Sequence, residues 1–206
     1  MKYDLSVALG ILTRGNSILI SRRMQSDTLG GAWELPGGKK EPGETTFETL
    51  RRELKEEIGI SVLSARPLIS TTRTLKDYHL NLAVFEVLNW SGFPEGKEGQ
   101  DIKWIRKDKL IDYSFPRYND PIRTAITLPS LACVTPPLTG GEDEYIESIL
   151  KILKSGVKLV QLRPQTAKYN LTKNIALRLH EQIRALEAIL MLNGKVSQFE
   201  SSIFQG

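Results

Sequence analysis

The sequence has few of the residues that mark several protein classes. Its 206 residues include one cysteine, two histidines and 7% aromatic residues. A single cysteine excludes an internal disulfide framework and is compatible with a reducing compartment. No apolar run approaches the length of a membrane span, and the N-terminus lacks the charged-then-apolar layout of a secretion signal. We therefore expect a cytoplasmic protein that does not bind membranes.

The sequence also lacks a segment in which charges of one sign are concentrated. Lys and Arg number 28 against 24 Asp and Glu, for a net charge of +4. The basic residues are spread out, with no basic patch interleaved with aromatic residues, so a small anionic ligand is favoured over polymeric nucleic acid. Cys133 lies in the apolar run 131–134, and we expect it to be a buried structural thiol and not a nucleophile.

Residues 38–60 predict a Gly/Pro loop that leads into a short helix. Thr45 is a good N-cap, and Glu48 completes a capping box. Gly59 suits the left-handed conformation that often ends a helix. Helical spacing places four apolar residues on one buried stripe: Phe47, Leu50, Leu54 and Ile58.

The carboxylates of this helix are its unusual feature. Glu53, Glu56 and Glu57 are spaced to share one face, where their like charges repel. A hard divalent cation would remove that repulsion, and Mg²⁺, with Mn²⁺ as the alternative, prefers such oxygen ligands and commonly bridges to substrate phosphates. Arg52, beside the cluster, would hold Glu44 or another carboxylate in place. The ordinary alternative is a solvated acidic helix face.

The rest of the chain predicts two α/β units. In residues 1–128 we expect strands at 4–13, 17–23, 62–72, 78–88 and 102–106, and a helix that opens near 115 and ends near 128. In residues 129–206 we expect strands at 130–135, 157–162 and 188–192, with helices at 143–154 and 170–186. These patterns favour an α/β/α sandwich followed by a smaller unit with parallel strands.

The string from Gly38 to Ile60 resembles the Nudix box, Gly-x5-Glu-x7-Arg-Glu-U-x-Glu-Glu-x-Gly-U with U aliphatic, and departs from it nowhere. Residues 3–128 resemble the MutT-like branch, the 8-oxo-dGTP diphosphatases. The supporting segments are 34–38 before the box, the Gly-Lys-Glu-Gly-Gln run 96–100, and Phe115-Pro116-x-x-Asn119-x-Pro121-Ile122. The resemblance implies a Nudix α/β/α sandwich and metal-dependent hydrolysis at the β-phosphorus of a nucleoside triphosphate.

The resemblance also implies roles for individual residues. The metal ligands would be Glu53, Glu56, Glu57, Glu98 and the carbonyl of Gly37. The catalytic set would be Arg52, Glu53, Glu57 and Glu98, with Glu98 as a further ligand or as the base that activates water. The substrate contacts would be Arg23, Glu34, Leu35, Pro36, Gly37 and Asn119. Asn119 would recognise the purine edge, and Leu35 and its neighbours would pack on the base.

Each role has a simpler alternative. The simpler interpretation of Glu98 is an exposed loop charge, that of Asn119 is a helix N-cap, and that of Arg23 is a charge at the end of a surface strand. One position departs from the branch: Thr28 stands where its best-known member has a histidine. That departure affects one substrate contact and not the chemistry.

Residues 129–206 resemble a thiamine-phosphate synthase at residues 156–163. That family folds as a (β/α)₈ barrel, and this segment is too short to close one. The family's Lys position holds Gln165 and its metal-binding Asp position holds Gly194, so we expect no synthase activity. An incomplete barrel-like segment leaves an open strand edge. Truncation of a longer protein and a homodimer formed through this edge both stay open.

Three functions follow. The first is Mg²⁺-dependent hydrolysis of 8-oxo-dGTP to 8-oxo-dGMP and pyrophosphate, which removes oxidised precursors before DNA replication and so avoids mutation. The second keeps the Nudix chemistry but acts on another nucleotide or a thiamine-related diphosphate. The third, of another class, is non-catalytic binding of a nucleotide or a thiamine phosphate. The intact acidic cluster favours an enzyme, and Asn119 favours the first function over the second.

Overall fold

The computed structural model describes residues 2–23, 30–163 and 169–193. The chain forms two compact units, residues 1–127 and 128–206, and each is described by itself. Thr28, Gln165 and Gly194, on which parts of the sequence analysis depend, lie outside the described residues. Within the described residues, no helix is both long and apolar enough to cross a bilayer.

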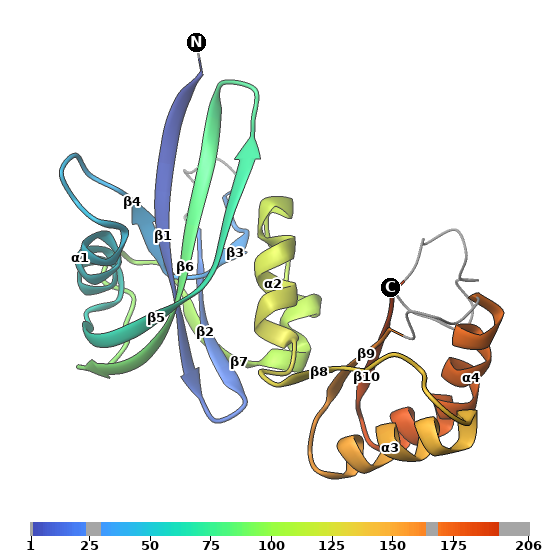
Figure 1. Cartoon of the computed structure of the whole chain (residues 1–206). Coiled ribbons are helices and arrows are strands. Elements are labelled where there is room, and N and C mark those ends of the chain that lie inside the picture. The colour runs from blue at the N-terminus through green and yellow to red at the C-terminus, as the bar shows by residue number, and fades with distance from the viewer. Residues whose placement is uncertain (1, 24–29, 164–168, 194–206) are drawn as a thin grey trace. The chain divides into compact units, whose positions relative to one another are not determined.

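The N-terminal unit is built on a seven-stranded mixed sheet (Figure 1). Its strands are β1 (Tyr3–Arg14), β2 (Ser17–Arg22), β3 (Trp33–Glu34), β4 (Gly37–Lys39), β5 (Ser61–Thr74), β6 (Tyr78–Ser91) and β7 (Ile102–Arg106). The main order is β3-β2-β1-β6-β5, with β4 paired to β1 and β7 paired to β2. β1 and β6 run parallel, in register from Tyr3 opposite Tyr78 to Leu12 opposite Val87, and the other pairs are antiparallel.

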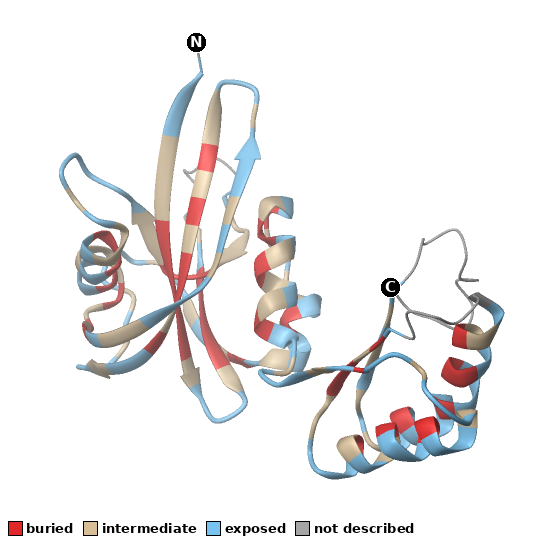
Figure 2. Cartoon of the chain, viewed as in Figure 1, coloured by how far each residue is buried: buried red, intermediate tan, exposed pale blue. Residues whose placement is uncertain are grey.

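Helices α1 (Thr46–Ile58) and α2 (Asp120–Thr127) cover opposite faces of this sheet. Side chains alternate along a strand, so β1 supplies both cores. Leu9 and Ile11 pack in the cluster that contains α2, while Ala8 and Leu12 pack in the cluster that contains α1. Figure 2 shows the buried residues along the middle of the sheet and on the sheet-facing sides of the helices. The predicted α/β/α sandwich is therefore confirmed.

The ends of α1 match their sequence predictions. The Thr45 hydroxyl accepts a hydrogen bond from the Glu48 N–H, and the Glu48 carboxylate accepts one from the Thr45 N–H, which completes the capping box. Gly59 ends the helix at φ 74°, a left-handed conformation that glycine adopts without strain. Three of the four predicted stripe residues are buried, and Phe47 is partly buried against the same core.

The observed elements differ from the sequence predictions in several places, and the short strands β3 and β4 were not predicted. β6 continues to Ser91, where a loop was expected from residue 90, because its end pairs with the start of β5 at Ser61 and Val62. The segment after β7 contains two 3₁₀ helices, Lys107–Asp112 and Arg117–Asn119, and only then α2. The predicted helix opening near residue 115 thus starts as a 3₁₀ turn.

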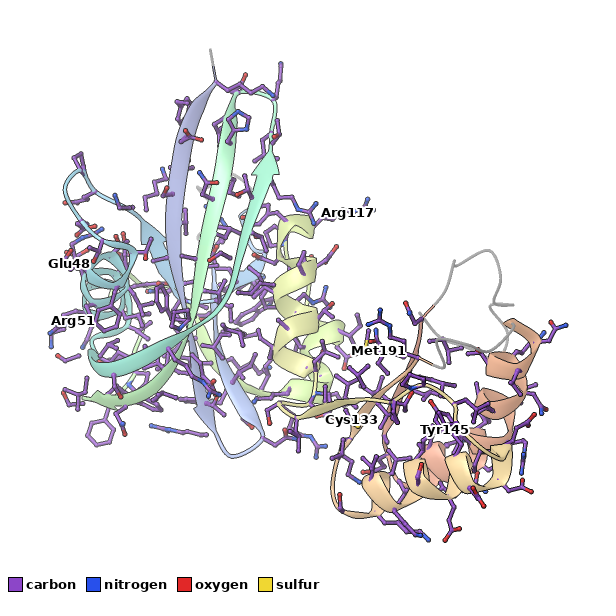
Figure 3. All side chains as sticks on the ribbon, in the orientation of Figure 1. Glu48, Arg51, Arg117, Cys133, Tyr145 and Met191 are labelled. Atoms are coloured by element: carbon purple, nitrogen blue, oxygen red, sulfur yellow. The ribbon has the colours of Figure 1, made fainter. Side chains whose placement is uncertain are left out.

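The C-terminal unit has the predicted alternation of strands and helices. Its elements are β8 (Ala132–Val134), α3 (Glu142–Lys154), β9 (Leu159–Leu162), α4 (Tyr169–Ala185) and β10 (Ile189–Leu192). The strands form a parallel sheet in the order β10-β9-β8. Val160 and Leu162 pack with apolar residues of both helices. The Tyr145 hydroxyl, labelled in Figure 3, donates to the carbonyl oxygen of Pro136 at 2.8 Å.

Cys133 differs from its prediction. Its thiol is half-buried at the edge of this core and makes only a weak contact, 3.8 Å from Sγ to the carbonyl oxygen of Val134. β8 has three residues, so its side chains are less covered than those of the central strand β9. The assignment of residues 129–206 as a thiamine-phosphate-synthase-like segment stays a prediction.

The capping box gives a test of this fold. Thr45→Ala removes the side-chain acceptor at the start of α1, so we expect the free energy of unfolding to fall by about 1 kcal/mol. Urea denaturation measures the loss. Thr46→Ala, one residue further along, is the matched control and should leave stability unchanged or slightly higher, because alanine has the greater helix propensity. Equal effects of the two substitutions would contradict the capping assignment.

Candidate active site

Most of the predicted site residues line one cleft of the N-terminal unit, with a volume of about 590 Å³. They come from five places: the ends of β2 and β3, strand β4, helix α1, the 92–101 loop between β6 and β7, and the residue just before α2. The predicted residues in the lining are Arg23, Glu34, Gly37, Glu53, Glu57, Glu98 and Asn119. Segments up to 96 residues apart in the sequence thus meet at one surface.

Leu35 and Pro36, predicted to contact the substrate, do not line the cleft. Leu35 is 2% exposed and packs in the core cluster that contains α2. Pro36 is also buried, and its carbonyl oxygen accepts a hydrogen bond from the Gly10 N–H at 2.9 Å. The core cluster around Leu35 also contains Leu9 and Leu82, which line the cleft. The packing of Leu35 on a base stays a prediction.

Arg52 and Glu56 also stand outside the cleft lining. The Arg52 guanidinium binds the Glu44 carboxylate through Nε at 2.7 Å and Nη2 at 3.1 Å. Its Nη1 donates to Glu53 at 2.9 Å and to Glu56 at 3.1 Å, and its Nη2 also donates to the Lys39 carbonyl oxygen at 2.9 Å. All five N–H donors of the guanidinium are thus used. Arg52 orients carboxylates and does not face the substrate space.

This network corrects the electrostatic expectation from the sequence. The three glutamates of α1 do not stand together unneutralised, because Arg52 bridges Glu53 and Glu56. Glu56 points to that guanidinium, and its side chain is 56% exposed. The same guanidinium lowers the pKa of Glu44 to about 2, chiefly through their hydrogen bonds. Arg52 therefore ties the loop before α1 to the acidic face of the helix.

Glu57 is the most perturbed carboxyl group of the cleft. Burial raises its pKa to about 7, and the strongest opposing effect is the hydrogen bond from the Gly37 N–H to Oε2, at 2.7 Å. Gly37 has φ 137°, and a Cβ there would lie 2.2 Å from the Ala8 carbonyl oxygen, so only glycine fits at this close approach of β4 to β1. The cleft thus holds a carboxyl group that changes charge near neutral pH.

Glu53 is held in a second tight approach to β4. A Cβ on Gly38 would lie 2.3 Å from a carboxylate oxygen of Glu53, so the missing side chain of Gly38 makes room for that group. Burial raises the pKa of Glu53, against the lowering effect of Arg52. Glu98 lines the same cleft from the 92–101 loop and is exposed.

The donor set fits a hard divalent cation in part. In the described parts of the chain, no three His, Cys, Asp or Glu side chains stand close enough together to form a complete metal site. Glu53, Glu57 and Glu98 nevertheless offer carboxylate oxygens to one cleft, and Mg²⁺ is commonly held by one or two carboxylates with water and substrate phosphates. Glu56 is the least available of the four predicted carboxylate ligands, because it does not line this cleft and its carboxylate is paired with Arg52.

The lining of the same cleft includes a polar group suited to binding a base. Asn119 is 3% exposed, and its Oδ1 has no hydrogen-bond partner. That acceptor therefore does not cap α2, which was the alternative role for Asn119. Nearby, Arg23 donates to the Glu34 carboxylate at 2.8 Å, so Arg23 is anchored and is not a free surface charge. A buried amide oxygen without a partner costs free energy unless a ligand satisfies it.

Several lining residues were not identified from the sequence. Tyr3 and Tyr78, opposite each other on β1 and β6, stack with ring centroids 5.4 Å apart, and Tyr118 lies beside Asn119 in the lining. These tyrosines carry no local sequence signal, since only the strand pairing brings the first two together. Lys39 was also missed, although it stands inside the Gly-rich part of the box.

Comparisons with known proteins identify the family. The profile of the NUDIX domain matches residues 7–125. The chain belongs to the Nudix family. It is 36% identical to the 8-oxo-dGTP diphosphatase of Escherichia coli (strain K12) over 119 residues, which are 57% of this chain and 92% of that protein. It is 28% identical to the CTP pyrophosphohydrolase of the same organism over 121 residues, 59% of this chain and 90% of that protein.

A solved structure agrees with this assignment. It comes from a study of MutT from Aliivibrio salmonicida and Vibrio cholerae, has 33% sequence identity, and superposes with a TM-score of 0.53 over 60% of this chain and 96% of the other. The predicted relationship to MutT-like Nudix proteins is thus confirmed, and the chain is a Nudix hydrolase. Nudix hydrolases generally use divalent metals, which suits the carboxylate-lined cleft.

The raised pKa of Glu57 predicts a pH dependence of stability. In the unfolded chain this carboxyl group titrates near 4.5, and in the folded protein near 7. The folded state therefore binds the proton more tightly, and stability falls as pH rises from 4.5 to 7, by up to about 3 kcal/mol from this group alone. Glu57→Gln keeps an acceptor for the Gly37 N–H and removes the charge.

In EDTA, we expect Glu57→Gln to be more stable than the wild type at pH 8 and about equal to it at pH 5. Urea denaturation at the two pH values gives the difference in stability between the two proteins. Glu44, whose lowered pKa makes stability rise with pH, contributes equally to both proteins and cancels from this difference. A stability difference that does not change with pH would show that Glu57 titrates normally.

Proposed function

We propose that this Nudix protein hydrolyses a purine nucleoside triphosphate, with 8-oxo-dGTP as the leading candidate, to the monophosphate and pyrophosphate. The observation that carries the proposal is the polarity of the cleft. Glu53, Glu57 and Glu98 line it together with the buried, unpartnered Oδ1 of Asn119. Such a cleft suits a ligand with a polyphosphate, bound through a metal, and a base that can donate a hydrogen bond.

The chemistry divides between the cation and the chain. Mg²⁺, or Mn²⁺ in its place, supplies charge neutralisation for the polyphosphate and lowers the pKa of water when it is bound. Glu53 and Glu57 would hold the cation, with the Gly37 carbonyl as a further ligand. Arg52 keeps Glu53 oriented through its bond at 2.9 Å. Glu98, exposed at the cleft, would take a proton from the attacking water. Attack of water at the β-phosphorus would break its bond to the oxygen that bridges the α- and β-phosphates, so the nucleoside monophosphate would leave and the water oxygen would end in pyrophosphate.

A second substrate class has support from one relative. The CTP pyrophosphohydrolase of Escherichia coli is similar over much the same length of chain, and an amide oxygen accepts hydrogen bonds from pyrimidines as well as purines. A thiamine-related diphosphate is a weaker candidate. Cytoplasmic location, a role in cleaning the nucleotide pool, and a homodimer formed through residues 129–206 stay predictions.

Pyrophosphate release in a panel of nucleotides with Mg²⁺ tests the substrate. The panel should contain the normal ribo- and deoxynucleoside triphosphates and 8-oxo-dGTP. We expect the highest kcat/KM for 8-oxo-dGTP and a lower value for dGTP. A preference for CTP or dCTP would replace the leading candidate, and no turnover of any nucleotide would favour a non-catalytic binding protein.

Glu57→Gln tests the metal-binding end of the cleft. Loss of this charge should lower kcat by at least about 100-fold, while the circular dichroism spectrum stays that of the wild type. Glu41→Gln, on the exposed loop before α1, is the control and should keep full activity. Near wild-type turnover in Glu57→Gln would refute the assignment of the site.

Asn119→Ala tests the base-binding end. Removal of the amide should raise KM for the preferred nucleotide roughly tenfold or more, since a lost hydrogen bond to a buried group costs about 1–3 kcal/mol. The effect on kcat should be small. Asn89→Ala is the control, because Asn89 is exposed on β6, where its side-chain amide donates to the Ser64 hydroxyl. Equal KM values in the two variants would exclude Asn119 from substrate binding.

A further inference from the structure

The 92–101 loop, which carries Glu98, is fastened to the C-terminal end of α1. The last four carbonyl groups of a helix have no partner within it. Here the Glu57 carbonyl oxygen accepts from the Lys97 N–H at 2.9 Å, and the Ile58 carbonyl oxygen accepts from the Glu95 N–H at 3.1 Å. The loop thus completes the hydrogen bonding of the helix that holds Glu53 and Glu57.

Gln100 adds a side-chain link between the two catalytic segments. Its Oε1 accepts a hydrogen bond from the Glu98 N–H at 3.0 Å, and its Nε2 donates to the Glu57 carbonyl oxygen at 2.8 Å. The Glu57 carbonyl therefore uses both of its lone pairs, one for Lys97 and one for Gln100. A primary amide fits this place because one partner is a donor and the other an acceptor.

The backbone is shaped to allow this arrangement. A Cβ on Gly96 would lie 2.1 Å from the Gln100 carbonyl oxygen and 3.0 Å from its Oε1. Gly96 therefore leaves the space in which the chain from 96 to 100 folds back on itself. The Gly-Lys-Glu-Gly-Gln run thus combines a close backbone approach, a cleft-facing carboxylate and the amide that joins that carboxylate's backbone to α1.

We propose that Gln100 is a positioning residue for Glu98. It fixes the backbone of Glu98 relative to that of Glu57, so that both carboxylates reach the same metal and phosphate group in the cleft. This inference rests on the proposed function for its consequence in catalysis. Its structural part, the link between Glu98 and α1, stands independently of the substrate.

Removal of the Gln100 side chain should leave the loop attached to α1. Two backbone hydrogen bonds from the loop to α1 remain when the Gln100 side chain is removed. Each neutral hydrogen bond contributes only about 0.5–1.5 kcal/mol, so the loop stays attached and the protein stays folded. The restraint on residues 98–100 is lost, so the backbone of Glu98 becomes more mobile.

Two variants separate the two halves of the link. Gln100→Met is close in size and loses both hydrogen bonds. Gln100→Glu keeps an acceptor for the Glu98 N–H but places an oxygen against the Glu57 carbonyl. Glu95→Gln is the control, since the Glu95 side chain contacts Lys97 and lies outside the cleft lining.

Three readouts apply to the full chain. The first is amide hydrogen exchange at Glu98 without metal or nucleotide, which should be about tenfold faster in Gln100→Met and near wild type in Gln100→Glu. The second is Mn²⁺ binding to the nucleotide-free protein, followed by electron paramagnetic resonance, which should be about tenfold weaker in both variants. The third is turnover of the preferred nucleotide, where kcat should fall about 10- to 100-fold with little change in KM. Glu95→Gln should match the wild type throughout.

Wild-type Mn²⁺ affinity and kcat in Gln100→Met would overturn the proposal. So would equal losses in Glu95→Gln, which would show a general disturbance of the loop. If the wild type hydrolyses no nucleotide, the proposed function fails, but amide exchange and Mn²⁺ binding still decide the role of Gln100.

Discussion

One guanidinium group organises the acidic helix of this protein. Arg52 uses all five of its N–H donors on three carboxylates and one backbone carbonyl. It joins the loop before α1, strand β4 and the acidic face of α1, so three carboxylates coexist there without a metal. A lysine offers no planar fork and could not make these contacts together. The arginine of the Nudix box is thus explained by the organisation of the carboxylates, with no need for contact with the substrate.

The remaining carboxylates have a different environment. The Glu57 carboxylate accepts a hydrogen bond from the Gly37 N–H and is largely removed from water, and its pKa rises accordingly. The folded protein therefore carries an electrostatic cost at Glu57 above neutral pH. A divalent cation in the cleft would offset that cost. The same α1 helix thus presents Glu56, which is paired with Arg52, and Glu57, which is available to a ligand in the cleft.

Local patterns in the sequence predicted much of this arrangement. The Nudix box predicted α1 with both of its ends, and strand patterns predicted the longer strands of both units but not the short strands β3 and β4. Leu35, which was predicted to contact the base, is buried in the core, and local patterns did not show this. Lys39, Tyr3 and Tyr78 were missed because their place in the cleft depends on strand pairing. Gln100 was missed because its partner, Glu57, is 43 positions away, and no local pattern encodes such a contact.

The role of Glu56 also could not be predicted from the local sequence pattern. Helical spacing placed it on one face with Glu53 and Glu57, but it could not tell which carboxylate the neighbouring guanidinium would take. Rotamers and hydrogen bonds decide between a ligand and an ion-pair partner, and these depend on the folded surroundings. For the C-terminal unit, the alternation of strands and helices predicted that the strands run parallel. It did not predict what this unit does.

The central claim is that carboxylates lining the cleft, Glu57 above all, hold the catalytic metal, while Glu44 and Glu56 stay paired with Arg52. Anomalous diffraction from a crystal of the protein with Mn²⁺ and a non-hydrolysable nucleotide tests it most directly. The account predicts a Mn²⁺ peak in contact with Glu57 and at least one of Glu53 and Glu98, with the Arg52–Glu44 pair unchanged. A peak on Glu44 or Glu56 with Arg52 displaced, or a Mn²⁺ site outside this cleft, would contradict it.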